Sequence, residues 1–137
     1  MQAKQKSIEF RLDMESGVPV YRQIIDQVTA GMATGALRPG DQLPTVRQVA
    51  VDLAINPNTV QRAYREMEIR GVLATQQGTG TFISHQKMER AEVERRRQLA
   101  QLAADFVARG GAAGFTVQEL LEAVQESVDS GKERKRR

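Results

Sequence analysis

The sequence is poor in the residues on which much enzyme chemistry depends. It contains no cysteine, no tryptophan and a single histidine among its 137 residues. Without cysteine the chain has no disulfide, no thiolate metal site and no cysteine nucleophile. We interpret the lone His85, which has no neighbouring cysteine, as a surface histidine. No Ser/His/Asp grouping and no phosphate-binding loop is evident, so the sequence predicts neither an enzyme nor a metal or cofactor site.

Long apolar segments are also lacking. No stretch approaches the roughly 18 apolar residues of a membrane helix, and residues 1–6 lack the apolar segment of a signal peptide. We therefore expect a cytoplasmic protein without a membrane partner. The charge is nearly balanced, with 20 lysines and arginines against 17 acidic residues. Binding to an acidic partner would thus depend on where the basic side chains lie rather than on the total charge.

The most informative segment, residues 56–68, is predicted to be a capped helix with two unlike faces. Asn56 is suited to the N-cap and Pro57 to the first helical position, where a missing donor costs nothing. One face is apolar (Val60, Ala63, Tyr64 and Met67), and the other carries amide and guanidinium groups (Asn58, Gln61, Arg62 and Arg65). Such groups can pair with base edges in the major groove of DNA or with phosphates. A merely solvated polar face is the alternative.

The segments on either side of this helix complete a DNA-binding motif. Residues 45–53 form a short amphipathic helix, with Thr45 and Gln48 at capping-box spacing and Arg47 on its outer side. Only two residues separate it from the next helix, which indicates a helix-turn-helix. Beyond this motif, Gly71 is suited to a helix C-cap, and residues 72–75 and 81–83 are predicted to be two strands around a glycine-bearing tip.

A hairpin directly after a helix-turn-helix is a wing, whose tip lies along the phosphate backbone or in the minor groove. An ordinary glycine-rich turn is the alternative. Ahead of the motif, the alternation of Ile8, Phe10 and Leu12 predicts a short strand. Residues 19–34 carry a helical apolar stripe, and the loop at residues 37–43 could pair with the wing. Arg38 of this loop is expected on the DNA side.

Four segments resemble the GntR family of bacterial transcription regulators, and most closely its YtrA-like branch: residues 18–24, 37–47, 56–64 and 78–83. The resemblance covers roughly residues 8–84. It implies that Arg47 contacts DNA, that the start of the 56–68 helix contacts bases or phosphates, and that Gln77 and Gly78 lie at the wing tip. Pro57 and Gln61 stand where many relatives have arginine, so the operator sequence of those relatives cannot be transferred. The predicted DNA contacts are Arg38, Thr45, Arg47, Asn56, Asn58, Thr59, Gln61, Arg62, Arg65, Gln77, Gly78 and Thr79.

The C-terminal region is predicted to be a helical hairpin. A charged, alanine-rich helix over residues 86–109 ends in a glycine-rich turn at residues 110–114, and a capping box at Thr116 and Glu119 starts a second helix. Apolar stripes run along both helices: Leu99, Leu102 and Phe106 on the first, and Val117, Leu120, Leu121, Val124 and Val128 on the second. A hairpin alone leaves these stripes uncovered, so we expect them to form a homodimer contact, as in YtrA-like relatives. Packing back onto the winged helix of a monomer is the alternative.

The sequence therefore predicts an α+β, mostly α protein: a winged helix-turn-helix over residues 1–84, a two-helix dimerisation hairpin over residues 85–130, and a basic, disordered tail over residues 131–137. The predicted function is a homodimeric repressor that binds a palindromic operator in double-stranded DNA. Two alternatives remain open. One is a regulator gated by an unknown small-molecule effector at the dimer contact, and the other is a winged helix used for protein or RNA contact.

Overall fold

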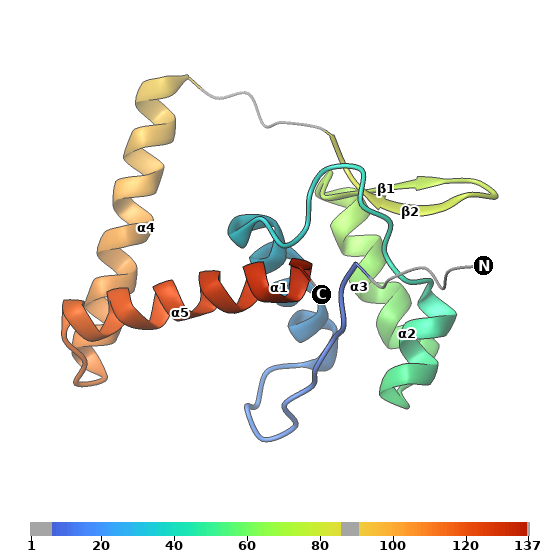
Figure 1. The fold of residues 1–137 in the computed structure, drawn as a ribbon, viewed down its shortest axis with the longest axis horizontal. Coiled ribbons are helices and arrows are strands. Elements are labelled where there is room, and N and C mark those ends of the chain that lie inside the picture. The colour runs from blue at the N-terminus through green and yellow to red at the C-terminus, as the bar shows by residue number, and fades with distance from the viewer. Residues whose placement is uncertain (1–6, 86–90, 137) are drawn as a thin grey trace.

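The computed structural model describes residues 7–85 and 91–136, and of residues 132–136 only the helical backbone. Its elements follow in the order α1 (Val20–Thr34), α2 (Val46–Leu53), α3 (Pro57–Ile69), β1 (Leu73–Gln76), β2 (Gly80–Ile83), α4 (Glu92–Ala112) and α5 (Val117–Arg136). Three helices and a two-stranded hairpin form one unit, while α4 stands apart from it and α5 returns toward α1 (Figure 1). This arrangement confirms the predicted mostly helical fold, with a wing after the helix-turn-helix and two C-terminal helices.

The core of the N-terminal unit is built around α3, which packs against both α1 and α2. Its apolar face is the one predicted from helical spacing, because Val60, Ala63, Tyr64 and Met67 are all buried. The same core contains Ile24, Ile25 and Val28 of α1, Val49 and Ala50 of α2, and Phe10, Leu37, Leu43, Leu73 and Ile83. Burying one face of α3 in this way leaves the opposite face directed toward solvent.

Both ends of α3 are capped as the sequence predicts. The Asn56 side chain accepts a hydrogen bond of 2.8 Å from the backbone N–H of Asn58, and Pro57 occupies the first turn. At the other end Gly71 has φ +79°, and the Val72 N–H donates to the Met67 carbonyl at 2.8 Å. This is the bonding pattern of a Schellman motif, which needs a left-handed residue just past the helix. The caps therefore set where α3 begins and where the wing follows.

The turn between α2 and α3 depends on a left-handed residue that is not glycine. Ala54 has φ +54°, and the next N–H, that of Ile55, donates to the Ala50 carbonyl at 3.0 Å. At the start of α2, Thr45 caps the helix by accepting from the Gln48 N–H at 3.1 Å. The predicted capping box is only half formed, because the Gln48 side chain donates to Asp52 instead of returning to Thr45.

A buried tyrosine joins α3 to the segment that leads into α2. The hydroxyl of Tyr64, which is 1% exposed, donates a hydrogen bond of 2.6 Å to the carbonyl oxygen of Pro44. Burial raises the pKa of this phenol well above its usual range, since ionisation would place a charge in the core. The bond fixes the position of the α2 start relative to α3.

Replacing Tyr64 with phenylalanine should lower the free energy of unfolding by about 1 to 2 kcal/mol, because the Pro44 carbonyl loses its partner. Denaturant unfolding at pH 7 measures this loss. In the wild type, the unfolded chain releases the phenolic proton of Tyr64 near pH 10, whereas the folded protein still retains it there. Stability therefore declines as the pH rises above that value, and the phenylalanine variant should lack this part of the decline. Equal stability of the two proteins at pH 7 would contradict this role.

The predicted strand at residues 8–12 is wrong, because residues 8–13 form no strand. The segment is held instead by two glutamine side chains of α1. Gln27 accepts from the Arg11 N–H at 2.9 Å and donates to the Arg11 carbonyl at 2.7 Å, and Gln23 bonds both the N–H and the carbonyl of Asp13. These amides satisfy the backbone groups that a neighbouring strand would have satisfied, while Phe10 still enters the core.

The wing is an antiparallel hairpin in which Leu73 pairs with Ile83 and Gln76 with Gly80. A third segment pairs with it, as the sequence predicts for the 37–43 loop. The Leu43 N–H donates to the Thr81 carbonyl and the Gly40 N–H to the Ile83 carbonyl, each at 2.8 Å. The wing is therefore supported along β2, and its three-residue tip extends beyond these backbone hydrogen bonds.

The C-terminal helices differ from the prediction at their ends. Gly110 and Gly111 lie inside α4, and the turn begins only at Ala113. Gly110 packs closely against α5, since a Cβ added there would lie 2.4 Å from Leu120 Cδ1. The predicted capping box is confirmed, because Thr116 and Glu119 each accept from the other's N–H at 3.2 and 3.1 Å.

The second helix is also longer than predicted. Helix α5 continues to Arg136, so residues 131–136 extend the helix instead of forming a separate disordered tail. None of the helices in the described part of the chain combines the length and the apolar character needed to cross a membrane.

Candidate nucleic-acid interface

The outward face of α3 carries side chains that are available to a ligand. Asn58, Gln61 and Arg65 are exposed, opposite the buried face. Arg47 is exposed on α2, which packs directly against α3. Within the described ranges, the Arg47, Gln61 and Arg65 side chains have no hydrogen-bond or ion-pair partner. Their donors are therefore free to pair with base edges or phosphates.

Arg62 differs from its neighbours on this face. Its guanidinium carbon lies 3.8 Å from the centre of the Tyr21 ring of α1, the geometry of a cation–π contact. The same guanidinium lies 3.9 Å from Glu66, which is also 3.6 Å from Arg70. Arg62 is thus directed to α1 by contacts within the protein, and it connects α1 to α3.

Two of the predicted contacts, Asn56 and Thr45, cap the helices α3 and α2 with their side chains. The Asn56 side-chain oxygen caps α3, which leaves its amide N–H groups for an outside acceptor. Thr59 is half-buried, and its backbone N–H bonds the Asn56 carbonyl at 3.0 Å. Thr45 is exposed, and its hydroxyl oxygen accepts the α2 cap bond while its proton remains available. Asn56 and Thr45 thus fix where α3 and α2 begin, and both retain a donor for DNA.

The structure separates Arg38 from the predicted contacts at the wing tip. Gly40, two residues after Arg38, bonds Ile83 at the base of the wing, at the end away from the tip. A Cβ at Gly40 would lie 3.2 Å from the exposed His85 ring, which confirms that this loop borders the exit from β2. Arg38 therefore lies at the wing base rather than beside Gln77, Gly78 and Thr79.

The tip of the wing is held by a residue that no sequence pattern singles out. The Gln42 side chain donates a hydrogen bond of 3.1 Å to the Thr79 carbonyl. The Gln42 carbonyl accepts from the Ser7 hydroxyl, and Gln42 also forms a β-bridge with Phe82. Gly80 has φ +136°, and a Cβ there would lie 2.4 Å from Gln42 Nε2. The conformation of the exposed tip (Gln77, Gly78 and Thr79) thus depends on Gln42.

Replacing Gln42 with leucine removes the donor to Thr79 at similar side-chain size. We expect the affinity for specific DNA to fall about 3- to 10-fold, as for the loss of one neutral hydrogen bond. Hydroxyl-radical footprinting should show weaker protection under the wing tip and unchanged protection under α3. Uniformly weaker protection across the site would contradict a role confined to the wing.

A metal centre does not emerge from the described ranges, in which no three His, Cys, Asp or Glu side chains are grouped closely enough to hold an ion. What the structure presents is a capped helix with free amide and guanidinium groups, a preceding helix joined by a tight turn, and a supported wing. A protein built in this way is a winged helix-turn-helix DNA-binding protein.

Comparison with known proteins specifies the family. The family model described as bacterial regulatory proteins, gntR family, matches residues 20–83. The uncharacterized HTH-type transcriptional regulator YhcF of Bacillus subtilis is 37% identical over 117 residues, which span 85% of this chain and 96% of YhcF. The chain belongs to the GntR family, and it is a DNA-binding transcriptional regulator rather than an enzyme.

Further relatives define the branch. The HTH-type transcriptional repressor YtrA of Bacillus subtilis is 45% identical over 74 residues, which span 54% of this chain and 57% of that protein. The solved structure of YtrA from Sulfolobus acidocaldarius, a GntR-family transcription factor, superposes with a TM-score of 0.52 at 30% identity, covering 70% of this chain and 97% of that one. These matches confirm the YtrA type that the motifs of the sequence indicate.

Proposed function

We propose that this protein is a homodimeric repressor that binds a palindromic DNA operator. The observation that carries the proposal is the combination, in one chain, of a free DNA-reading face on α3 and uncovered apolar stripes on α4 and α5. One face reads a half-site, and the stripes bring two copies together. A two-fold dimer then matches a two-fold symmetric operator, with half-sites about one helical turn apart.

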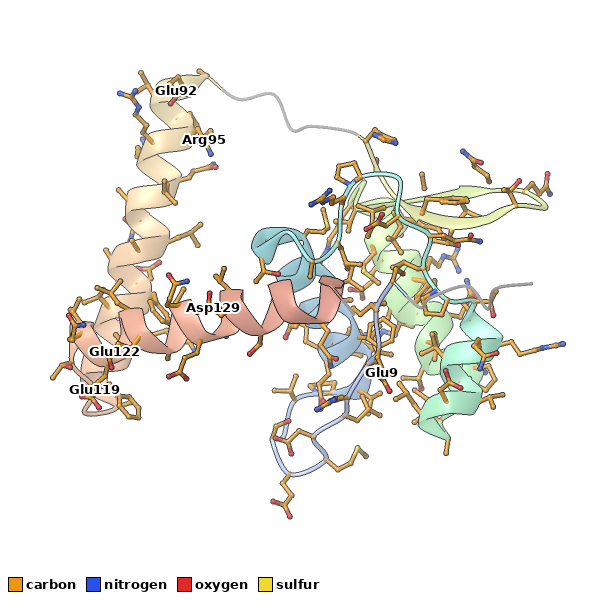
Figure 2. The ribbon with its side chains drawn as sticks, viewed as in Figure 1. Glu9, Glu92, Arg95, Glu119, Glu122 and Asp129 are labelled. Carbon is orange, nitrogen blue, oxygen red and sulfur yellow. The ribbon has the colours of Figure 1, made fainter. Side chains whose placement is uncertain are left out.

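The apolar stripes support dimerisation because the structure leaves them exposed. Leu102 is 68% exposed, Leu99 and Leu121 are each 59% exposed, and Phe106, Val117 and Val124 are exposed as well. Of the predicted contact residues only Leu120 and Val128 are half-buried. A row of exposed apolar side chains along two helices is typical of an interaction site. Charged residues of the hairpin, including Glu92, Arg95, Glu119, Glu122 and Asp129, project from the same two helices (Figure 2).

The monomer alternative requires the hairpin to bury its stripes on the winged helix. Among the described elements, α4 contacts α5 alone, and the contact of the hairpin with the winged helix is made by α5 on α1. Helix α4, with Leu99, Leu102 and Phe106, remains uncovered. A second copy of the chain is therefore the better partner for these side chains.

Repression is the simplest outcome of operator binding. A dimer seated on promoter DNA excludes RNA polymerase from the same site without any further contact. The Bacillus subtilis relative YtrA is named a transcriptional repressor, which favours the same direction of regulation here.

Effector control is the second candidate, and the hairpin offers one hollow for it. A cavity of about 250 Å³ at the α4–α5 turn is lined by Phe115, Glu119, Leu120 and Ala123. Ligand pockets usually enclose ~300 Å³ or more. The hairpin of one subunit therefore provides little room, and an effector site at this place would have to be completed by the second subunit.

A gel shift and footprint on DNA from upstream of the protein's own gene, titrated with salt and unrelated duplex, tests the proposal. A protected two-fold symmetric site that survives competitor supports a dimeric regulator, and light scattering should give the mass of two chains. Equal binding to all duplexes that disappears with salt would exclude it and favour the protein- or RNA-contact alternative.

A further inference from the structure

The hairpin and the winged helix are connected by one contact between elements. Within the described parts of the chain, α5 packs on α1, and no other element of the hairpin packs on the winged helix. Figure 1 shows α5 running from the hairpin turn back to α1, while α4 stands away. The orientation of the DNA-reading helix relative to the dimer contact therefore depends on where α5 meets α1.

The contact between α5 and α1 is close and leaves little room for a side chain at Gly131. A Cβ added to Gly131 of α5 would lie 3.0 Å from the Thr34 hydroxyl oxygen, 3.3 Å from Thr34 Cβ and 3.7 Å from Ala36 Cβ. Thr34 itself is fixed at the end of α1, since its hydroxyl donates to the Gly31 carbonyl at 3.2 Å. The same oxygen accepts from the Ala36 N–H at 3.4 Å. A small side chain at position 131 needs its neighbours to shift by a few tenths of an ångström, whereas a bulky one such as leucine must displace α5 from α1.

Movement at this contact reaches the DNA-reading face through rigid packing. Helix α1 supplies Ile24, Ile25 and Val28 to the core that also buries α3. On the surface, Tyr21 of α1 lies under Arg62 of α3. Close-packed interiors transmit displacement rather than absorb it, so α1 and α3 move together relative to α5.

We infer that the Thr34–Gly131 contact sets the distance between the two α3 helices of the dimer and thereby selects the spacer between operator half-sites. The inference rests on the proposed homodimer and palindromic operator. The length of α5 makes the effect large: its 20 residues span ~30 Å. A displacement of a few ångströms at its far end matches the rise of about one base pair, 3.4 Å, in B-DNA.

The first test replaces Gly131 with leucine and measures affinity for a panel of operators whose spacers differ by single base pairs. The variant should prefer a spacer changed by at least one base pair, or lose a wild-type preference of 10-fold or more. Its dimer mass and its affinity for a single half-site should remain those of the wild type. Gly111→Leu is the matched control, because a Cβ at this exposed glycine of α4 meets nothing within 4 Å.

A second test uses the absence of cysteine from the chain. The separation of 3.3 Å between Thr34 Cβ and a Cβ at Gly131 is close to the range of 3.5 to 4.5 Å found in disulfides. The double variant Thr34→Cys, Gly131→Cys should therefore form a disulfide within one subunit on oxidation, seen as a monomer-sized band on a non-reducing gel. The oxidised protein should keep the wild-type spacer preference, and the two single variants serve as controls.

Three results would overturn the inference: an unchanged spacer preference in Gly131→Leu, a disulfide that joins two subunits, or a locked protein that prefers another spacer. Failure of the proposed function is distinguishable, because it is seen in the wild-type protein. A wild-type protein that is monomeric, or that protects no two-fold symmetric site, would exclude both the proposed function and this inference.

Discussion

Replacing Arg47 with alanine is expected to lower operator affinity about 5- to 150-fold, which corresponds to a loss of 1 to 3 kcal/mol if this arginine makes a paired contact to guanine. The side chain is exposed on α2 and has no partner within the described residues. Its removal therefore costs no internal interaction, and the folded state and the dimer should be unaffected. Fluorescence anisotropy with labelled operator at fixed salt measures the change.

Arg97→Ala is the matched control for Arg47. Arg97 is an exposed arginine of α4, and helical spacing places it opposite Leu99, Leu102 and Phe106. Removing it subtracts the same charge away from the reading face, so operator affinity should change less than 2-fold. If the Arg47 variant bound the operator with wild-type affinity, Arg47 would not be part of the interface. The proposal that α2 and α3 contact the operator would then be weakened.

Replacing Leu102 with glutamate is expected to convert the dimer to a monomer and to lower the affinity for the full operator by about 100-fold or more. Leu102 is 68% exposed in the single chain, so the charge is harmless there. In a dimer contact the carboxylate would lose water without gaining a partner, which is strongly unfavourable. Each subunit would then bind its half-site alone, without the gain from linking two sites. Light scattering and operator titration measure the two effects.

Ala104→Glu provides the control for this substitution. Ala104 is exposed on α4 and lies away from the apolar stripe by helical spacing, so the same charge should leave the dimer intact. A Leu102→Glu protein that keeps the mass of two chains would show that the subunits associate through another surface. A wild-type protein that is monomeric at micromolar concentration would instead favour the folded-back alternative.

Local features of the fold could be predicted from the sequence because their causes lie within a few residues. Asn56 and Pro57 identify the start of α3, Gly71 marks its end, and helical spacing separates its buried from its exposed face. The wing follows from two short strands around glycines. The free arginine on α2 could be identified as well, because spacing alone places Arg47 on the outer side of that helix.

Features that depend on distant partners could not be predicted. The alternation of Ile8 to Leu12 suits a strand, but Gln23 and Gln27 satisfy that backbone instead. The pair Gly110 and Gly111 favours a turn, yet both residues lie in α4, where Gly110 packs against Leu120 of α5. Arg62 shares a face with Arg65, but the ring of Tyr21 attracts it. In each case the deciding group is far away in the sequence or belongs to another helix.

The buried core has an evolutionary consequence. The apolar side chains of the core cluster lie between Phe10 and Ile83, and α4 and α5 contribute none of them. Substitutions in the hairpin therefore leave the free energy of folding of the winged helix almost untouched. Selection can remodel the C-terminal helices, or exchange them for another assembly module, while the DNA-reading unit continues to fold. The two halves of the chain are thus free to diverge at different rates, and the junction that must stay compatible is the small patch where α5 meets α1.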